Sequence, residues 1–183
     1  MAGPAAVLVV AATPRELEGA EGARSFACGI GPVEAAARTA VELAGDRATA
    51  LLHVGIGGVR AGAGPRLLDA VVGSRSLYCD SALAEPIMPD PGMLAAVTAA
   101  LPDAFLLPIG TSARVGGTTG TSVEAMEGYA VLRAAALAGV PALELRVISN
   151  EIEEQDRSRW AFDDAFARLA EVTRAAVAAL SRG

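Results

Sequence analysis

The chain has 183 residues, a formal net charge of −6 and no lysine, and 52% of its residues are hydrophobic but only 4% aromatic. This length predicts one domain with a substantial core built mainly of Ala, Val and Leu. The scattered arginines argue against a nucleic-acid-binding face, and no apolar run reaches the roughly 18–20 residues that a membrane helix needs. The first apolar run resembles a strand more than a signal peptide, so a cytoplasmic location is expected.

Residues suited to metal binding are scarce. Cys28 and Cys79 show no CxxC spacing, and His53 is the only histidine. The sequence therefore predicts neither a disulfide framework nor a His/Cys metal site.

Apolar runs alternate with amphipathic segments over the first half of the chain. Strands are expected at 6–12, 25–29 and 49–54, and the segment 67–80 indicates one or two strands around Gly73. Helices are expected from Arg15 to Glu18, after the Thr13-Pro14 start signal, and over 33–44. Glycine-rich turns are expected at 29–32 and 55–58, each directly after a strand.

The same alternation continues in the second half. We expect a helix at 92–101, a strand at 105–109, a loop at 110–122, a helix at 127–138 and a strand at 143–148. The final amphipathic helix, 160–181, carries Phe162 and Phe166 on its apolar face. This order predicts an α/β fold with a largely parallel or mixed central sheet.

Polar loops are expected beyond the carboxyl ends of the strands, where open α/β sheets bind ligands. The first offers Glu16, which is either an exposed first-turn glutamate or a general base that takes a proton from water. The glycine loops offer backbone N–H groups. Gly29-Ile30-Gly31 resembles the start of a dinucleotide fingerprint, but Glu34 departs from that pattern, so a tight turn is the commoner explanation.

Two further polar positions stand out, at 126–127 before an apolar helix and at 149–150 after an apolar strand. Taken singly, Met126 can be a core residue, Glu127 a first-turn carboxylate and Asn150 a helix cap. Two carboxylates and an amide together suit cleavage of an N-glycosidic bond. Carboxylates stabilise an oxocarbenium-like sugar, and hydrogen bonds to the base help it leave.

Five segments resemble the nucleoside phosphorylase and nucleosidase superfamily, and within it the futalosine hydrolases most closely. They are VVAATPRELE, ACGIGPVEAAA, HVGIGGVRAG, VEAMEGYAVLRAAALAGVPALELRVISN and EQDRSRW. The resemblance implies a single-domain, three-layer nucleoside phosphorylase-like fold over residues 1–183, with a central mixed sheet flanked by helices. It also implies an enzyme that hydrolyses futalosine to hypoxanthine and dehypoxanthine futalosine in menaquinone biosynthesis, without a cofactor or a metal.

The resemblance implies a role for each of several residues. Glu16 falls on the water-activating glutamate of related nucleosidases, and Met126 and Glu127 fall on the pair that packs under the ribose and binds its hydroxyls. The amides of Gly57 and Gly58 are expected near the junction of sugar and base.

Asn150 falls where adenine-specific relatives have an aspartate that protonates N7. Its NH₂ group suits the acceptors of a 6-oxopurine, which points to hypoxanthine as the leaving base, although a rotated amide would also accept a 6-amino group. Glu16 favours water over phosphate as the nucleophile, because a carboxylate would repel an anion. Arg15 and Arg60 are near enough in the sequence to bind phosphate, so a phosphorylase remains an alternative. These residues also leave open an adenine-releasing nucleosidase and a non-catalytic nucleoside-binding module.

The segment 110–122 departs from the family, since it is shorter than in relatives and lacks an evident aromatic residue to stack on a purine. Thr111, Ser112 and Ala113 are expected at the base in its place, and Arg114 is a conceivable partner for the carboxyphenyl group of futalosine. A small nucleoside is the expected ligand, with neither nucleic acid nor membrane as partner. A homo-oligomer is also expected, and dimers are the commonest arrangement.

Overall fold

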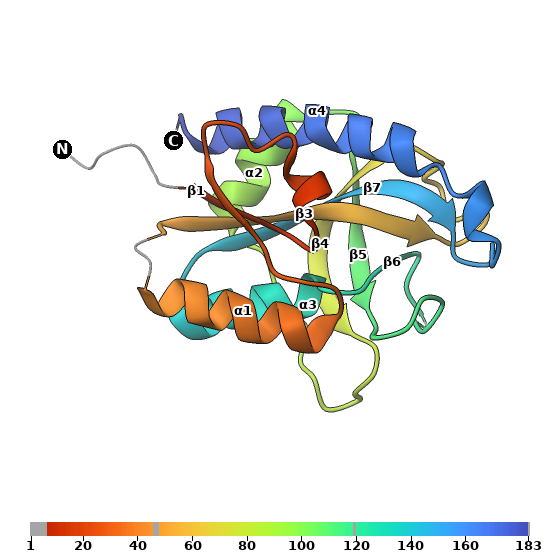
Figure 1. Ribbon diagram of the computed structural model, residues 1–183, viewed down its shortest axis with the longest axis horizontal. Helices are drawn as coiled ribbons and strands as arrows, with labels where there is room; N and C mark the ends of the chain where they lie inside the picture. The colour runs from red at the N-terminus through yellow and green to blue at the C-terminus, as the bar shows by residue number, and fades with distance from the viewer. Residues whose placement is uncertain (1–6, 46–47, 119, 183) are drawn as a thin grey trace.

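The computed structural model describes residues 7–45, 48–118 and 120–182, in which a mixed sheet is covered by helices on two sides (Figure 1). The strands are β1 (Val7–Ala11), β2 (Arg24–Ala27), β3 (Ala50–Val59), β4 (Ala70–Tyr78), β5 (Phe105–Thr111), β6 (Val123–Ala125) and β7 (Ala142–Glu151). The helices are α1 (Pro32–Gly45), α2 (Pro91–Ala100), α3 (Gly128–Ala138) and α4 (Phe162–Leu180), with 3₁₀ turns η1 (Pro14–Leu17) and η2 (Arg157–Arg159). The predicted α/β class with a mixed sheet flanked by helices is confirmed.

The sheet partly closes on itself. Its strand order is β2-β1-β3-β6-β5-β4-β7, and β7 pairs in addition with β3. A closed ring of pairings is therefore formed by β3, β6, β5, β4 and β7. From this ring β1 and β2 extend as parallel neighbours. Only the β3–β6 and β4–β7 pairs are antiparallel.

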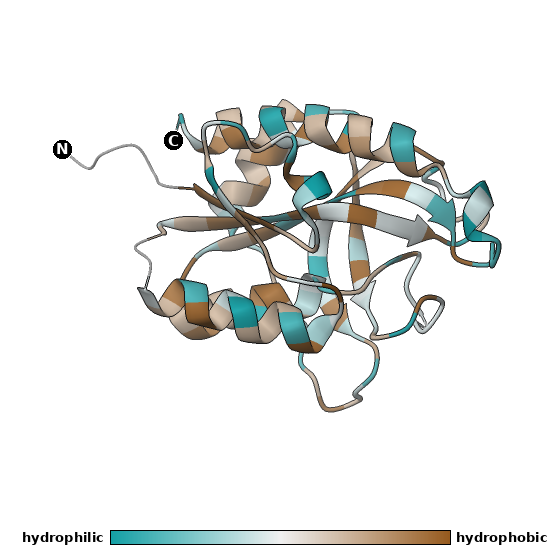
Figure 2. Cartoon of the chain, viewed as in Figure 1, coloured by the Kyte–Doolittle hydropathy of each residue, from teal (hydrophilic) through white to brown (hydrophobic). Residues whose placement is uncertain are grey.

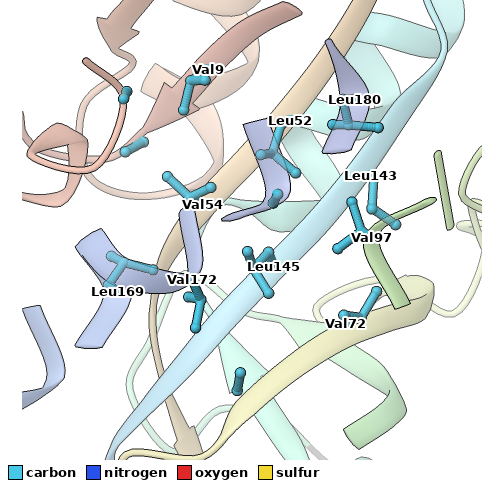
Figure 3. Packing of buried hydrophobic residues seen from close by; sticks show 14 of the residues in the cluster. Val9, Leu52, Val54, Val72, Val97, Leu143, Leu145, Leu169, Val172 and Leu180 are labelled. Atoms are coloured by element: carbon cyan, nitrogen blue, oxygen red, sulfur yellow. The ribbon is translucent and has the colours of Figure 1, made fainter. Parts of the chain in front are cut away.

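Three apolar clusters hold these layers together. The first lies between the sheet and helices α2 and α4, and includes Val9, Leu52, Leu145, Leu169 and Val172 (Figure 3). The second lies between the sheet and helices α1 and α3, and alternate residues of β1 point into the two clusters. The third is drawn from all five ring strands. In Figure 2 β1 is brown and the other central strands mix brown with white and teal, while α1 and α4 alternate apolar and teal residues, as amphipathic helices do.

The expected turn at 55–58 is wrong, because β3 runs straight through these glycines to Val59. Pairing with β7 and β6 supplies the hydrogen bonds that a turn would have supplied otherwise. Glycine is needed here for space. A Cβ on Gly55 would lie 2.9 Å from a Glu16 carboxylate oxygen, and one on Gly58 would lie 3.1 Å from the Asn150 amide nitrogen.

Asn150 and its neighbour Ser149 lie inside β7 and not beyond its end. The register shifts there, since Gly57 pairs with Ile148 but Gly58 pairs with Asn150, so that Ser149 is the extra residue of a β-bulge. Bulges redirect the side chains that follow them and are frequent beside functional sites.

The boundaries of the other strands and helices lie closer to those expected from the sequence. The segment 67–80 forms one strand with an irregularity between Gly73 and Arg75, and β6 arises where only a loop and a helix start were expected. The first expected helix is a single 3₁₀ turn, and α3 begins one residue after Glu127. Ala6, in the first expected strand, lies outside the described residues. None of the helices in the described part of the chain is both long and apolar enough to span a bilayer.

Candidate active site

A cavity of about 330 Å³ opens where η1, β3, β6 and β7 meet. Six of the residues expected from the sequence line it: Glu16, Gly57, Gly58, Met126, Glu127 and Asn150. These residues come from four separate segments of the chain, and the pairings of β3 with β1, β6 and β7 bring the segments together.

Glu16 is buried and firmly oriented. Its Oε2 atom accepts hydrogen bonds from the Thr13 backbone N–H and the Thr13 hydroxyl, both at 2.9 Å, and its Oε1 atom accepts one from Ile56 N–H at 3.1 Å. A carboxylate offers about four lone-pair positions, two on each oxygen. One position on Oε1 therefore remains, which suits it to take a proton from a water molecule.

Glu127 precedes α3, and its Oε1 atom accepts a hydrogen bond at 2.8 Å from the N–H of Gly31. Gly31 has a φ of +89°, a left-handed conformation that glycine adopts readily. Burial raises the pKa of the Glu127 carboxyl above its usual value of 4.5, and Glu16 and Glu144 add to the rise, while Arg146 and the Gly31 N–H oppose it.

A fully buried cation, Arg146, lies behind the two cavity carboxylates. Its Nε donates to Glu144 at 2.9 Å, and its Nη2 lies 2.5 Å from His53 Nε2. Burial opposes its charge, but the carboxylates of Glu144, Glu127 and Glu16 raise its pKa, so it stays protonated.

His53 is neutral, because burial and the charge of Arg146 hold its pKa well below the usual 6.5. Its Nδ1 donates to the carbonyl of Val10 at 2.9 Å, which leaves Nε2 as an acceptor for Arg146. Sequence reasoning missed the position of Arg146. The signal available was Glu144 and Arg146, two residues apart in the otherwise apolar strand 142–148, because alternate residues of a strand share a face and buried charges require partners.

The Asn150 amide has one orientation that satisfies both its hydrogen bonds. Oδ1 accepts from the Ser149 hydroxyl at 2.9 Å, and Nδ2 donates to the carbonyl of Glu151 at 2.9 Å. One N–H of the amide then remains for a ligand in the cavity.

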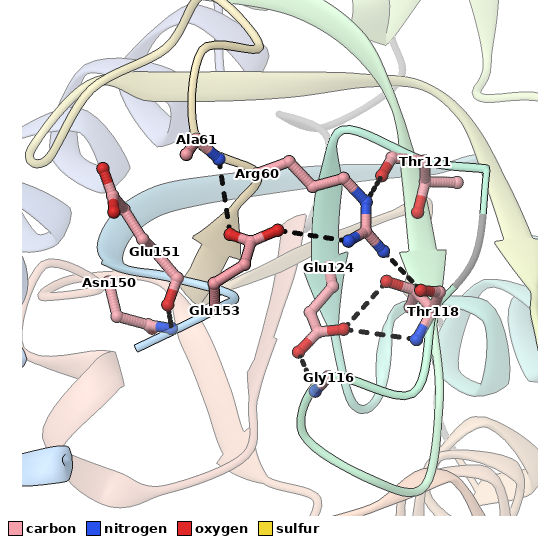
Figure 4. A network of polar contacts seen from close by, with 9 residues as sticks. All are labelled: Arg60, Ala61, Gly116, Thr118, Thr121, Glu124, Asn150, Glu151 and Glu153. Carbon is pink, nitrogen blue, oxygen red and sulfur yellow. Dashed lines mark hydrogen bonds and ion pairs between the residues drawn. The ribbon is translucent and has the colours of Figure 1, made fainter. Parts of the chain in front are cut away.

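A third carboxylate, Glu124, also lines the cavity but is engaged with a loop (Figure 4). It accepts hydrogen bonds from Gly116 N–H and from the N–H and hydroxyl of Thr118. Arg60 binds the same loop through the carbonyls of Thr118 and Thr121, and also pairs with Glu153. Glu124 thus anchors the loop that brings Val115 to the cavity.

The aromatic wall absent from the sequence analysis is supplied by Trp160, Phe162 and Phe166, which line the cavity together with Arg157. The sequence analysis placed Phe162 and Phe166 on the apolar face of the final helix, and both side chains are only partly buried at the start of α4. Their position depends on the chain between β7 and α4, which contains the family-like segment EQDRSRW but no pattern that predicts where its side chains lie.

Three expected base contacts do not reach the cavity. Thr111 accepts from Tyr129 N–H, while the Ser112 hydroxyl and the Ala113 N–H both donate to Asp80. None of them lines the cavity, and neither does the exposed Arg114. Pairing of β5 with β4 and β6 continues to Thr111, and the two residues that follow it turn to Asp80.

Comparisons with known proteins agree with this geometry. Residues 112–182 match the model of the Phosphorylase superfamily. The expected resemblance to this superfamily is confirmed. A futalosine hydrolase from Streptomyces coelicolor is 50% identical over 50 residues, which are 27% of this chain and 21% of that protein. The aligned stretch thus spans about a fifth of the length of that curated relative.

Solved structures share this fold over almost the whole chain. A 5′-methylthioadenosine/S-adenosylhomocysteine nucleosidase from S. pneumoniae has a TM-score of 0.84 at 19% identity, covering 95% of this chain and 99% of that one. A futalosine hydrolase mutant of Helicobacter pylori has a TM-score of 0.84 at 16% identity, covering 94% and 98%. At these identities the likeness shows the fold.

Three carboxylates line the cavity: Glu16, Glu124 and Glu127. Within residues 7–45, 48–118 and 120–182, no group of three or more His, Cys, Asp or Glu side chains is arranged to hold a metal ion.

Proposed function

We propose that this chain hydrolyses the N-glycosidic bond of a 6-oxopurine nucleoside, with futalosine as its substrate, hypoxanthine as the leaving base and no cofactor. The observation that carries the proposal is the convergence of Glu16, Glu127 and Asn150 on one cavity, each with a hydrogen-bonding position left for a ligand. Futalosine is also the substrate for which the similar S. coelicolor and H. pylori proteins are named.

Glu16 acts as the general base. The C1′–N9 bond of the nucleoside breaks, and its electron pair leaves with the base. The oxygen of a water molecule bonds to C1′, while its proton passes to Glu16 Oε1. Glu16 then returns that proton to solvent, and the departing base takes one up. Proton transfer to a positioned carboxylate contributes about 10²–10⁴-fold to the rate of such reactions.

Glu127 holds the sugar and stabilises the cationic transition state. One of its oxygens is fixed by Gly31, so the other faces the ribose hydroxyls above Met126. Its negative charge favours the positive charge that develops on the sugar. Arg146 balances the carboxylates from behind, and its charge offsets the repulsion between Glu16 and Glu127.

Asn150 discriminates between bases. Its remaining N–H donates to N7 or O6 of a 6-oxopurine, which stabilises the negative charge on the leaving base. A 6-aminopurine would need the amide to rotate. Rotation would set the amide oxygen about 2.9 Å from the Glu151 carbonyl, so that two acceptors face each other and one hydrogen bond is lost.

Water is favoured over phosphate as the nucleophile by the places of the arginines. Arg15 pairs with Asp163, and Arg60 is engaged with the loop at 118–121 and with Glu153. Of the arginines in the described part of the chain, only Arg157 lines the cavity. The site beside Glu16 thus presents a carboxylate where a phosphorylase needs cations.

A base-release assay on the purified protein tests the proposal. Futalosine, aminodeoxyfutalosine, methylthioadenosine and inosine are each supplied with and without phosphate, and the released base is identified by chromatography. We expect hypoxanthine from futalosine at a rate that phosphate does not change. Release of adenine alone would indicate an adenine-specific nucleosidase, strict dependence on phosphate a phosphorylase, and no release of any base a non-catalytic binding module.

A further inference from the structure

A second cavity, of about 590 Å³, adjoins the first. Five residues line both cavities: Thr13, Arg157, Trp160, Phe162 and Phe166. The two are therefore continuous, and we refer to the second as the aromatic extension. It lies on the side of the site formed by η1, η2 and the start of α4.

Three aromatic rings form a row along this extension. The centroids of Trp160 and Phe162 are 5.4 Å apart, and those of Phe162 and Phe166 are 6.2 Å apart with an angle of 15° between the ring planes. Trp160 is held in place because its Nε1 donates to the carbonyl of Glu154 at 3.0 Å. A row of this kind suits a flat, apolar ring of the ligand.

Two guanidinium groups lie over these rings. Arg15 lies 4.4 Å from the centroid of Phe166, and Arg157 lies 5.5 Å from that of Trp160. Arg15 forms an ion pair with Asp163, which also lines the extension, so their charges offset one another. Among the described residues Arg157 has no carboxylate within ion-pair distance, and its charge is available to a ligand.

The negative charges of the first cavity restrict where an anionic group of a ligand can bind. Glu16, Glu124 and Glu127 all line it and would repel an anionic group of the ligand. An anionic substituent is therefore favoured only on the side of Arg157. Arginine can bind a carboxylate through two parallel N–H···O hydrogen bonds, which adds geometric selectivity.

We propose that Arg157 determines substrate specificity by binding the carboxylate of an aromatic acid carried on the sugar, whose ring packs along Trp160, Phe162 and Phe166. This inference rests on the proposed function and deepens it, since futalosine carries a carboxyphenyl substituent of this kind. It replaces Arg114 as the expected partner of that carboxylate.

The first test compares futalosine, its methyl ester and inosine as substrates of the R157M, R157K and wild-type proteins. Methionine keeps an apolar stem over Trp160 but removes the charge. We expect R157M to raise the KM for futalosine about tenfold or more relative to the KM values of the methyl ester and inosine, and R157K to recover part of this difference. R168M, on the outer face of α4, is the matched control.

A second test needs no turnover and uses Trp160, the only tryptophan of the chain. We expect 3-acetylbenzoate to change the tryptophan fluorescence of the wild type with saturation, and its methyl ester and the R157M protein to show a weaker response. Equal loss of futalosine and ester turnover in R157M, or equal binding of acid and ester, would overturn the inference. Saturable, Arg157-dependent binding of the acid without futalosine hydrolysis would retain the subsite and reject the proposed function.

Discussion

The Glu127 carboxylate accepts a hydrogen bond at 2.8 Å from the backbone N–H of Gly31, which lies 96 positions earlier in the chain. The bond joins the residue before α3 to the turn before α1, and so ties the two helices on one side of the sheet to the cavity. Because Glu127 is buried and lies near Glu16, ionising it costs free energy that an exposed glutamate would not incur.

Replacing Glu127 is therefore expected to raise the free energy of unfolding while lowering the activity. Its pKa is higher in the folded than in the unfolded protein, so the folded state loses stability as the pH rises through this interval and stays less stable above it. E127Q should have a larger free energy of unfolding than wild type at about pH 7.5, and the difference should close as the pH approaches the usual 4.5. Urea denaturation at several pH values measures this, and a wild type more stable than E127Q at pH 7.5 would contradict it.

The same substitution should lower turnover. Loss of the charge beside the developing sugar cation is expected to reduce kcat about 10²–10³-fold. In the wild type, kcat/KM should fall on the acid side at a pH above that of an ordinary glutamate, because the ionised form is lost there. An acid limb at or below pH 4.5 would remove Glu127 from this role.

Glu16→Gln should leave substrate binding largely intact and remove most turnover. The amide oxygen can still accept from a backbone N–H, but it is too weak a base to take a proton from water, so kcat should fall about 10²–10⁴-fold with KM changed little. E18Q, on the exposed neighbour, is the control. Steady-state kinetics on futalosine measure both, and near-normal turnover in E16Q would exclude Glu16 as the base.

Asn150→Asp should change the preferred base. An aspartic acid can donate to N7 and, when ionised, accept from a 6-amino group, whereas it loses the second N–H of the amide. We expect the ratio of hypoxanthine to adenine released from a futalosine and aminodeoxyfutalosine mixture to fall at least about tenfold. An unchanged ratio would show that Asn150 does not discriminate between hypoxanthine and adenine as the leaving base.

Removal of Arg146 alone should be strongly destabilising. R146M leaves Glu144 buried without its partner, at an expected cost of about 3–5 kcal/mol in the free energy of unfolding. The double variant R146M/E144M removes both charges and should recover part of this loss. Chemical denaturation of the two variants and of E144M alone forms a double-mutant cycle, and additive costs would contradict the coupling.

Gly55→Ala tests how closely Arg146 and Glu16 approach β3. A Cβ at Gly55 would overlap the Arg146 guanidinium and lie 2.9 Å from Glu16, so we expect a loss of about 1–3 kcal/mol and reduced turnover. G45A is the matched control, because a Cβ there meets nothing within 4 Å. Equal stability of the two variants, measured by thermal unfolding, would refute the steric argument.

The periodicity of the chain was enough to predict the α/β class and most elements. Apolar runs such as 6–12 and 143–148 carry their strand signal locally, and the helix at 127–138 has a glycine stop at Gly139. The local sequence signals were misleading at 55–58, where a turn was expected, and at 149–150, which was expected to follow a strand; both segments lie inside strands. Glycines that indicate a turn in isolation lie in β3, because pairing with a distant strand decides their conformation.

Some residues of the candidate site were likewise predicted from the sequence, and others were recognised only in the folded structure. Glu16, Met126, Glu127 and Asn150 were identified from residue type and family resemblance, since each lies within a recognisable short motif. Arg146, Arg157 and Trp160 also lie in family-like segments but were given no role, and Thr111 to Ala113 do not line the cavity. Residue types and short motifs are enough to show which groups are available for chemistry. Which of these groups share a cavity depends on the folded chain, because burial, charge pairing and strand register arise from residues that are far apart in the sequence.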